Sequence, residues 1–352
     1  MASKDKAAGG GNQQAAQPVT KPIKRPMAPR RPVRGYAFWL LLSLVLLVAT
    51  LTPLVRLGGP FPIIQALSPL WLILAVLALA WMARLRARVP AAFCLVALLA
   101  AVPWQLRLGS PATCASVADG ASRGVGGTEF TVLALNQEYS QADPAAVVAL
   151  AREAHADVLV LTETGAAAVA ALDQAGLEGA YPYRTEAVDD NTAGAAVILS
   201  NYPFTLEEAA AGTGWPAPAV TLEVGEQAVL LQAVHTRPPM SGLTTGWAQD
   251  LGALSRWQQA HPDQALILAG DFNASVVHPA YRGAVRGLDD AAKAGTWRML
   301  PTWPTDRFAV VPFIDIDHIV TRGLAARGWR AVKVAGTDHK AVIATLATCP
   351  AA

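Results

Sequence analysis

Leu-Ile-Leu-Ala-Gly-Asp-Phe-Asn, at residues 266–273, is the most informative run of this sequence. Its apolar first half is typical of a buried strand, which runs into Gly270. Asp271 and Asn273 follow two residues apart. A carboxylate in that place can orient or deprotonate a water, and an amide can donate to a developing oxyanion. A simple turn would also explain the pattern, so other parts of the chain must decide between the two.

Other apolar runs also end in polar side chains, at strand ends where a rigid sheet presents chemistry to solvent. Asn136 follows Thr-Val-Leu-Ala-Leu, Glu163 ends Asp-Val-Leu-Val-Leu-Thr-Glu, and His235 follows Ala-Val-Leu-Leu-Gln-Ala-Val. Each has a structural alternative. Asn136 alone fits a turn. Glu163 could pair with an arginine to offset its burial, and a lone histidine is more often structural.

Two late motifs place carboxylates beside imidazoles. Ile-Asp-His-Ile sets Asp317 inside an apolar strand, and Asp338 directly precedes His339 before the last strand. An imidazole needs a partner that fixes its tautomer, and a buried carboxylate is the usual one. We therefore expect Asp317 to orient His339 across neighbouring strands. His318 should face the opposite side of its strand, which leaves it outside the site.

Taken in order, these motifs resemble the endonuclease/exonuclease/phosphatase superfamily, the DNase I-like fold, over about residues 129–348. The run Gly-Ala-Ala-Val-Ile-Leu-Ser-Asn-Tyr-Pro-Phe at residues 194–204 is similar to the family's central segment. The resemblance implies a four-layered α/β sandwich, with two mixed sheets face to face and helices outside. It also implies hydrolysis of a phosphate ester with Mg²⁺ or Mn²⁺, and oxygen and amide ligands suit such ions.

The resemblance implies a role for each polar residue. The metal site would have Glu163 as its main ligand, with Asn136 and Asp338 nearby. Asp271 would activate or orient water, and Asn273 would hold a phosphoryl oxygen. His339, supported by Asp317, would stabilise the pentacovalent transition state. His235 would contact the phosphate or assist the leaving group. The metal would neutralise developing charge.

One position of the family pattern has no clear candidate. Some members place a helper carboxylate or aromatic between Glu163 and His235, and the residues that could serve here are Tyr183, Arg184 and Asp190. Arg237 could add a cationic phosphate contact, although its alternative is a rigid loop with the prolines that follow. Three aromatic residues, Trp297, Trp303 and Phe308, lie in a segment that could form a substrate-side loop or part of the core.

Short β-type runs alternate with Ala-rich helical stretches, which predicts one α/β catalytic domain at residues 129–349. The predicted strands cover residues 130–135, 157–161, 195–199, 220–224, 228–234, 266–268, 314–321, 331–334 and 341–348. The predicted helices cover residues 144–155, with Asp143 as a cap, and residues 244–261.

Three apolar stretches precede that domain, at residues 36–55, 61–82 and 89–106. Each approaches the roughly 20 residues needed to cross a bilayer, so we predict an N-terminal bundle of three transmembrane helices. Only 15% of the chain is charged, where about 25% is usual for a soluble protein. Residues 1–35 should be a disordered basic tail, and the Gly-, Ser- and Ala-rich residues 107–128 a linker.

The basic residues predict how the spans are oriented. Eight lie in the tail and three between the second and third spans, but only Arg56 lies between the first and second. Basic loops stay in the cytoplasm, so we expect a multi-pass protein of the cell membrane with a cytoplasmic N-terminus. Three spans then place the catalytic domain outside the cytoplasm. If the third stretch does not span, the domain lies inside.

Two of the three cysteines bracket the polar domain. Cys114 and Cys349 could pair in an oxidising compartment and join its ends. The alternative is two unrelated free thiols. The third, Cys94, lies within the third predicted span.

The substrate class follows from charge and tethering. Residues 106–352 carry 16 basic and 25 acidic residues, a net charge of 16 − 25 = −9, which lacks the basic footprint of a strong DNA binder. The phosphodiester could belong to a nucleic acid, a phospholipid head group or a nucleotide, and the basic tail could touch membrane lipid. A catalytically silent binding or scaffold protein on the same fold is the alternative. A transporter is disfavoured because the spans contain no charged residue.

Overall fold

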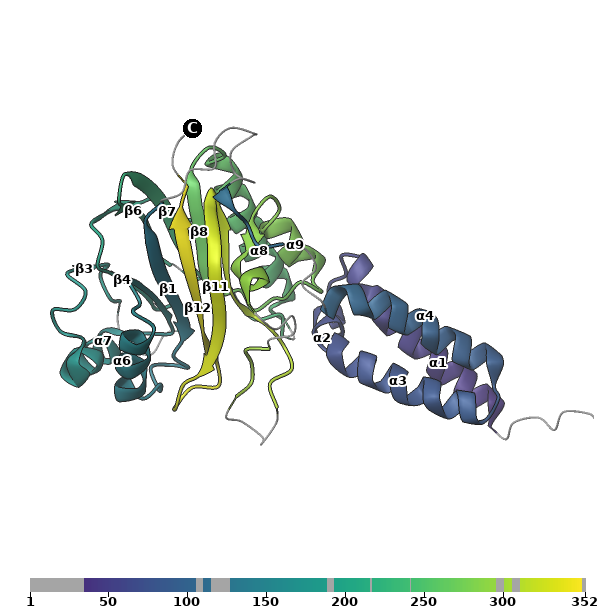
Figure 1. The fold of residues 1–352 in the computed structure, drawn as a ribbon. Helices are drawn as coiled ribbons and strands as arrows, with labels where there is room; N and C mark the ends of the chain where they lie inside the picture. Colours follow the sequence, from purple (N-terminus) through teal and green to yellow (C-terminus); the bar gives the residue numbers. More distant parts are fainter. Residues whose placement is uncertain are drawn as a thin grey trace, which may run out of the picture.

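The computed structural model describes residues 35–105, 110–114, 127–188, 193–215, 217–240, 242–295, 301–305 and 311–349. The predicted tail, except Gly35, and most of the predicted linker lie outside the described residues. Figure 1 shows an α/β body from which a bundle of helices projects.

Two six-stranded mixed sheets form the body. The first has the order β11 (Leu324–Lys333), β12 (Lys340–Thr348), β1 (Glu129–Asn136), β2 (Val158–Thr162), β4 (Ala196–Ser200) and β3 (Tyr183–Arg184). The second has the order β5 (Phe204–Glu207), β6 (Ala219–Val224), β7 (Gln227–His235), β8 (Ala265–Asp271), β10 (Asp317–Arg322) and β9 (Asp289–Asp290). The β1–β2 and β7–β8 pairs are parallel, and the other pairs are antiparallel.

Helices cover the outer faces of the sheets. Residues of α6 (Pro144–Glu153) and α7 (Ala166–Leu172), with the turn Asp173–Leu177, pack on the first sheet. Residues of α8 (Thr244–Ala260) and α9 (Pro279–Ala284) pack on the second. Asp143 caps α6 as predicted, because its Oδ1 accepts a hydrogen bond from the Ala145 amide at 2.9 Å. The predicted α/β sandwich is therefore present.

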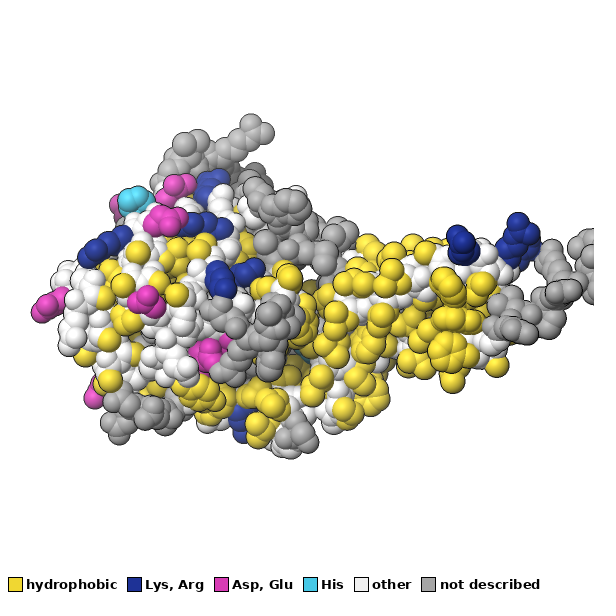
Figure 2. Space-filling view, turned by 90° about the horizontal axis from the view of Figure 1, so that it is seen from below, with side chains coloured by type: hydrophobic (Ala, Val, Ile, Leu, Met, Phe, Trp, Pro, Cys, Tyr) yellow, Lys and Arg dark blue, Asp and Glu magenta, His cyan; other side chains and the backbone are white. Residues whose placement is uncertain are grey.

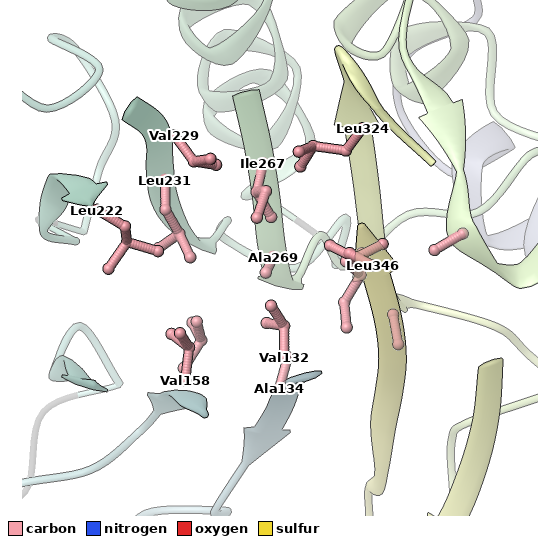
Figure 3. Packing of buried hydrophobic residues seen from close by; sticks show 14 of the residues in the cluster. Val132, Ala134, Val158, Leu222, Val229, Leu231, Ile267, Ala269, Leu324 and Leu346 are labelled. Atoms are coloured by element: carbon pink, nitrogen blue, oxygen red, sulfur yellow. The ribbon is translucent and has the colours of Figure 1, made fainter. Parts of the chain in front are cut away.

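The core lies between the two sheets. Along β1, Val132 and Ala134 face the second sheet, whereas Leu133 and Leu135 pack under the helices. Figure 3 shows the first pair pointing toward Ile267 and its neighbours across the interface. Both faces of such a strand are buried, so its sequence is a continuous apolar run instead of an alternating one.

Strand register brings the predicted site residues to one edge. Asn136 is level with Thr162, the residue before Glu163, in the parallel β1–β2 pair. Asp271 is level with His235 in β7 on one side and with Asp317 in β10 on the other. The polar ends of strands from both sheets therefore meet, although they are far apart in sequence.

The end of β8 requires a glycine. Gly270 has φ 135°, a conformation that side chains rarely adopt, and a Cβ there would lie 2.1 Å from the Val234 carbonyl oxygen. The close approach of β7 and β8 at this point places Asp271 beside His235. The glycine of the sequence motif thus serves the backbone that aims the carboxylate.

Some predicted strand boundaries were wrong. The strand predicted at 314–321 begins at Asp317, and Ile314 makes only an isolated bridge to Trp303. The strand predicted at 331–334 begins seven residues earlier, as β11. Its register shifts between Ala326 and Gly328, so its first half shows no regular alternation in the sequence. The short strands β3, β5 and β9 lack an apolar run long enough to predict them.

The N-terminal part contains α1 (Tyr36–Leu51), the turn Thr52–Leu54, α2 (Phe61–Ala66), α3 (Ser68–Arg84) and α4 (Arg88–Gln105). Helices α1, α3 and α4 pack together (Figure 1). The stretch predicted as one span at 61–82 is divided at Leu67, because Pro69 has no N–H to donate to the preceding turn. By length and composition, one helix of the described residues, Tyr36–Leu54, could cross a membrane, while α3 and α4 are apolar but shorter.

The bundle contacts the body through its α1–α2 connection. His278 Nε2 lies 2.9 Å from the Pro62 carbonyl oxygen, and the Arg282 guanidinium donates to the Pro53 carbonyl at 2.5 Å. The Thr244 hydroxyl donates to the Gly59 carbonyl at 3.1 Å. These bonds hold the α1–α2 connection and the start of α2 against the body, where they contact the start of α8 and the region of α9.

A disulfide joins the two ends of the body. Cys114 and Cys349 are bonded with their Cα atoms 5.2 Å apart, as the sequence predicted. Cys94 is free and buried within α4.

Candidate active site

A cavity of about 460 Å³ opens where the strand ends meet. Its lining includes six of the eight residues predicted to form the site: Glu163, His235, Asp271, Asn273, Asp338 and His339. The other two, Asn136 and Asp317, are buried behind them and hydrogen-bond to lining residues. The structure therefore brings all eight predicted residues together.

Glu163 follows β2 in a left-handed conformation, with φ 52°. Its carboxylate accepts hydrogen bonds from Asn136 Nδ2 at 2.9 Å and from the Tyr139 amide at 2.8 Å. Burial raises its pKa, and these hydrogen bonds lower it only in part. A cation that enters the cavity would favour the ionised form of this partly desolvated carboxylate.

Asn136 is the spacer between two carboxylates. Its Nδ2 donates to Glu163 and, at 3.0 Å, to Asp271 Oδ2, while its Oδ1 accepts from the Glu138 amide at 2.8 Å. The Thr337 hydroxyl donates to its main-chain carbonyl at 2.8 Å. The amide of Asn136 thus fixes how close the carboxylates of the two sheets come.

Asp271 is buried at the end of β8. Burial and the nearby charge of Asp317 raise its pKa to about 7. Its Oδ1 accepts from the Asn273 amide at 2.7 Å, and Asn273 Nδ2 donates to the Thr236 carbonyl at 2.8 Å. A carboxyl with a pKa near neutrality can take a proton and return it during a reaction at that pH.

His339 and Asp317 form a buried pair. The His339 Nδ1 lies 3.0 and 3.1 Å from the two Asp317 carboxylate oxygens. Burial alone would lower the pKa of His339, but the carboxylates of Asp317, Asp271 and Asp338 raise it to about 10. His339 is therefore an imidazolium at neutral pH, and its Nε2 lies 3.6 Å from Asp338 and 3.9 Å from Asp271.

His235, unlike His339, is uncharged at neutral pH. Burial, together with the charge of His339, lowers its pKa to about 3, so the ring is neutral. Its Nε2 lies 3.5 Å from Glu163 and 3.7 Å from Asp271, and these contacts are accordingly not ion pairs. The Trp215 ring packs on the imidazole with centroids 4.4 Å apart. The site thus pairs a charged imidazole with a neutral one.

Sequence reasoning missed Glu138, which lines the cavity and accepts the Asp338 amide at 2.8 Å. Its position two residues after Asn136, outside the apolar run, was the available signal. The sequence allows Trp303 either a core or a substrate-side role. It lines the cavity, and its indole N–H donates to Asp338 Oδ2 at 3.0 Å.

The remaining candidates lie elsewhere. Arg184 pairs with Asp173 at 2.7 Å on the outside of the first sheet, and Tyr183 lies beside it on the edge strand. Arg237 does not face the cavity, because Asp250 and the Gly246 carbonyl bind its guanidinium. Asp190, Trp297 and Phe308 lie outside the described residues. His318 packs on the far side of its strand against Phe272 and Tyr281, as expected.

The chemistry of the donor set fits a divalent cation beside Glu163. Among the described residues that line the cavity, His339 is the one cation, and it faces four carboxyl groups, those of Glu138, Glu163, Asp271 and Asp338. Carboxylate oxygens are the ligands that Mg²⁺ and Mn²⁺ prefer. A bound divalent cation would balance the excess negative charge.

A second group of potential ligands is less suitable. Atoms of Asp271, Asp317 and His339 lie within 4.8 Å of one another, close enough to surround an ion. However, a protonated imidazole has no lone pair for a metal, and Asp317 already binds its Nδ1. This trio is better suited to holding a proton and a positive charge than to holding a metal.

Comparison with known proteins agrees with this geometry. The sequence profile of the Endonuclease/Exonuclease/phosphatase family matches residues 129–339. A family protein from Bacteroides thetaiotaomicron is 14% identical, with TM-score 0.50, over 64% of this chain and 99% of that one. D. rerio TDP2 humanized by 14 mutations is 18% identical, with TM-score 0.51, over 62% of this chain and 99% of that one. No protein of curated function matches the chain. At these identities the solved structures show a shared fold.

Proposed function

The chain belongs to the Endonuclease/Exonuclease/phosphatase family, and on that premise we propose that it is a membrane-anchored phosphodiesterase that requires a divalent metal. The observation that carries the proposal is the single cavity in which Glu163, Asp271 and the charged His339 converge. These groups supply a metal ligand, a proton acceptor and a fixed positive charge. Groups of these three kinds recur in enzymes that transfer phosphoryl groups.

In the proposed reaction, a water oxygen bonds to phosphorus and the ester P–O bond breaks. Asp271 takes one proton from the water and later returns it to solvent, and the departing oxygen takes a proton from solvent, so the products are a phosphomonoester and an alcohol. The His339 imidazolium, which Asp317 keeps charged, donates to a phosphoryl oxygen as negative charge develops there. Neutral His235 and the amide of Asn273 orient the phosphate. Mg²⁺ or Mn²⁺, held by Glu163 with Asn136 and Asp338, would neutralise charge on the phosphate.

We further propose that the body lies outside the cytoplasm. In Figure 1, α1 begins and α3 meets α4 at the end of the bundle far from the body. That end therefore carries Arg84, Arg86 and Arg88, and the sequence that precedes α1 is basic. Basic residues favour the cytoplasmic side. The Cys114–Cys349 disulfide is also in keeping with an oxidising compartment.

A catalytically silent scaffold on this fold remains the competing function. Silent relatives of an enzyme need not keep a raised Asp271 pKa or a buried carboxylate–imidazolium pair, because isolated buried charges destabilise a fold. The intact arrangement therefore favours an enzyme.

A substrate panel tests the enzymatic proposal. Purified full-length protein in detergent would be incubated with single-stranded DNA, RNA, a phospholipid, a nucleotide diester and bis(4-nitrophenyl) phosphate, each with Mg²⁺, Mn²⁺ or EDTA. We expect hydrolysis of at least one ester with metal and none with EDTA. Absence of metal-dependent hydrolysis across the whole panel would favour the scaffold.

A further inference from the structure

We propose that the substrate is a membrane phospholipid, whose head-group phosphoester enters the cavity while its acyl chains stay in the bilayer along α2. This inference rests on the proposed phosphodiesterase activity and specifies its substrate class. The observation behind it is that the N-terminal part, which we propose anchors the enzyme, forms part of the wall of the active-site cavity.

One wall of the cavity comes from α2 and the residue that links it to α3, which together with the α1–α2 connection we call the hairpin. Ile63 and Ala66 of α2 and Leu67, which links α2 to α3, line the same cavity as Glu163 and His339. Ile63 keeps 43% of its surface exposed. An apolar side chain that faces an active-site opening, on a helix continuous with an apolar bundle, offers a surface for hydrocarbon.

A second part of the cavity lining is also apolar. Pro238, Pro239 and Met240 line the cavity next to His235 in the chain, and Met240 is 60% exposed. Phe313 lines the cavity from the segment before β10. The charged groups lie deeper, at the strand ends. A ligand with a phosphate at one end and hydrocarbon at the other matches this division.

The position of the hairpin is fixed by polar contacts. The carbonyl groups of Pro53, Gly59 and Pro62 are bound by Arg282, Thr244 and His278 of the body. These contacts lie before and at the start of α2. The cavity therefore sits at the level where the apolar bundle ends.

This level matches the position of lipid head groups. Helix α3 has 17 residues and so spans about 26 Å, close to the thickness of a hydrocarbon core of about 30 Å. Figure 2 shows hydrophobic side chains covering the bundle up to its junction with the body, and basic side chains, which are arginines in the described sequence, at its far end. A bundle embedded over this apolar length presents the cavity to the adjacent lipid surface.

Charge disfavours a long nucleic acid in the same cavity. No lysine or arginine is among the described residues that line it, and Arg237, the nearest in sequence to His235, is bound to Asp250. Nucleic-acid sites depend on cationic contacts to successive phosphates. A lipid presents a single phosphate, which the metal and His339 can match.

The test compares one ester in a membrane with one in water. Full-length protein in liposomes would be given phosphatidylglycerol, phosphatidylethanolamine or phosphatidylinositol in the same vesicles with Mn²⁺, and separately bis(4-nitrophenyl) phosphate or single-stranded DNA. Ile63→Asp places a charge on the hydrocarbon path, and Ile63→Ser is a milder second variant. Leu206→Asp is the matched control, because Leu206 is 71% exposed on β5 and does not line the cavity.

We expect wild-type protein to cleave at least one of the lipids faster than DNA. In Ile63→Asp the ratio of lipid to soluble-ester turnover should fall about tenfold, equivalent to about 1.4 kcal/mol. In Leu206→Asp the ratio should stay at the wild-type value. Ile63→Ser should lower the ratio in the same direction.

Three results would overturn the inference while leaving the phosphodiesterase proposal intact: cleavage of the soluble ester but of no lipid, faster cleavage of DNA than of lipid, or an unchanged ratio in both Ile63 variants. Failure of every ester with metal would instead reject the phosphodiesterase itself.

Discussion

His339 and His235 lie in one cavity but carry different charges. The carboxylates of Asp317, Asp271 and Asp338 keep His339 protonated, whereas burial and the charge of His339 keep His235 neutral. Two imidazoles with such different pKa values can fulfil different tasks at one pH. The charge on His339 depends most directly on Asp317, which contacts its Nδ1.

Asp317→Asn should therefore lower kcat about 100-fold, because the asparagine cannot hold a proton on His339. The basic limb of the pH–rate profile should also move to lower pH as the pKa of His339 falls, which a loss of folded protein would not cause. The double variant Asp317→Asn/His339→Gln should have nearly the same kcat as His339→Gln alone, because both changes remove the same charge. Asp289→Asn, at a half-exposed pair with Lys293, is the control and should leave kcat within about twofold. An unchanged profile in Asp317→Asn would remove Asp317 from its positioning role.

At the residue scale, the sequence predicted the groups that follow apolar strands. Asn136, Glu163 and Asp271 were identifiable because the strand before each is an uninterrupted apolar run. Glu138 and Trp303 were not, because each reaches the cavity from an irregular segment whose path depends on tertiary contacts. Strand ends have a predictable place in a sheet, and loops do not.

Strand β8 shows how an element positions a site. Near the end of β8 the backbone has φ 135° at Gly270, and there it passes directly against Val234. Any side chain at this position would separate β7 from β8 and shift Asp271 away from His235.

We expect Gly270→Ala to destabilise the protein by about 3 kcal/mol, from backbone strain together with the contact to Val234. Gly287→Ala is the matched control, because Gly287 has φ 81° but nothing lies within 4 Å of its added Cβ. It should cost only about 1 kcal/mol, from the conformation alone. Thermal unfolding of both variants in detergent measures the difference. Equal destabilisation would mean that the close approach to Val234 is unimportant.

The contact between α2 and the body depends on a neutral His278. Its Nδ1 accepts from the Ser275 amide at 2.9 Å, so its Nε2 carries the proton that faces the Pro62 carbonyl. Burial lowers its pKa from 6.5 to about 4. A protonated ring would lose the acceptor that Ser275 uses.

Stability should consequently fall as the pH is lowered from 6.5 to 4. In this window the unfolded state binds more protons at His278 than the folded state, so the contribution is complete above pH 6.5 and is lost toward and below pH 4. It amounts to about 3 kcal/mol at most. Thermal midpoints measured against pH should fall less steeply in His278→Asn than in wild type. The exposed His155→Asn serves as a control with the wild-type slope. Identical slopes in all three proteins would contradict this account of His278.

The sequence was less informative about elements than about residues. Strands β1, β6, β7 and β12 and helix α8 were predicted closely, because hydrophobic periodicity defines them. The division of the second apolar stretch into α2 and α3 was not predicted, although Pro69 marked it. This division creates the short helix that lines the cavity, so it matters to function.

At the scale of the whole molecule, the proposed membrane anchoring makes the side on which the body lies decide which substrates it meets. Cysteine accessibility in intact cells measures it. A membrane-impermeant maleimide should label Cys114 and Cys349 only after reduction by an impermeant reductant, because their disulfide blocks both thiols. The double variant with serine at both positions should stay unlabelled, because Cys94 is buried. Labelling only after cell lysis would place the body in the cytoplasm.

The division of the chain into an apolar bundle and an acidic α/β body was predictable from the sequence, because long apolar helices and sheet strands leave different hydrophobic patterns. How the two parts meet was not predictable. Contacts such as that between His278 and Pro62 join residues more than 200 positions apart, and no local sequence pattern predicts them.

The central claim is a metal-dependent phosphoesterase site centred on Glu163. It is tested most directly by hydrolysis of bis(4-nitrophenyl) phosphate by wild type, Glu163→Gln and the control Glu153→Gln, whose glutamate is exposed, as Mn²⁺ is titrated after EDTA treatment. We predict that added Mn²⁺ raises turnover about 100-fold in wild type and in Glu153→Gln, while Glu163→Gln stays at the level seen with EDTA. Turnover that is independent of metal, or a Glu163→Gln response equal to wild type, would contradict the account.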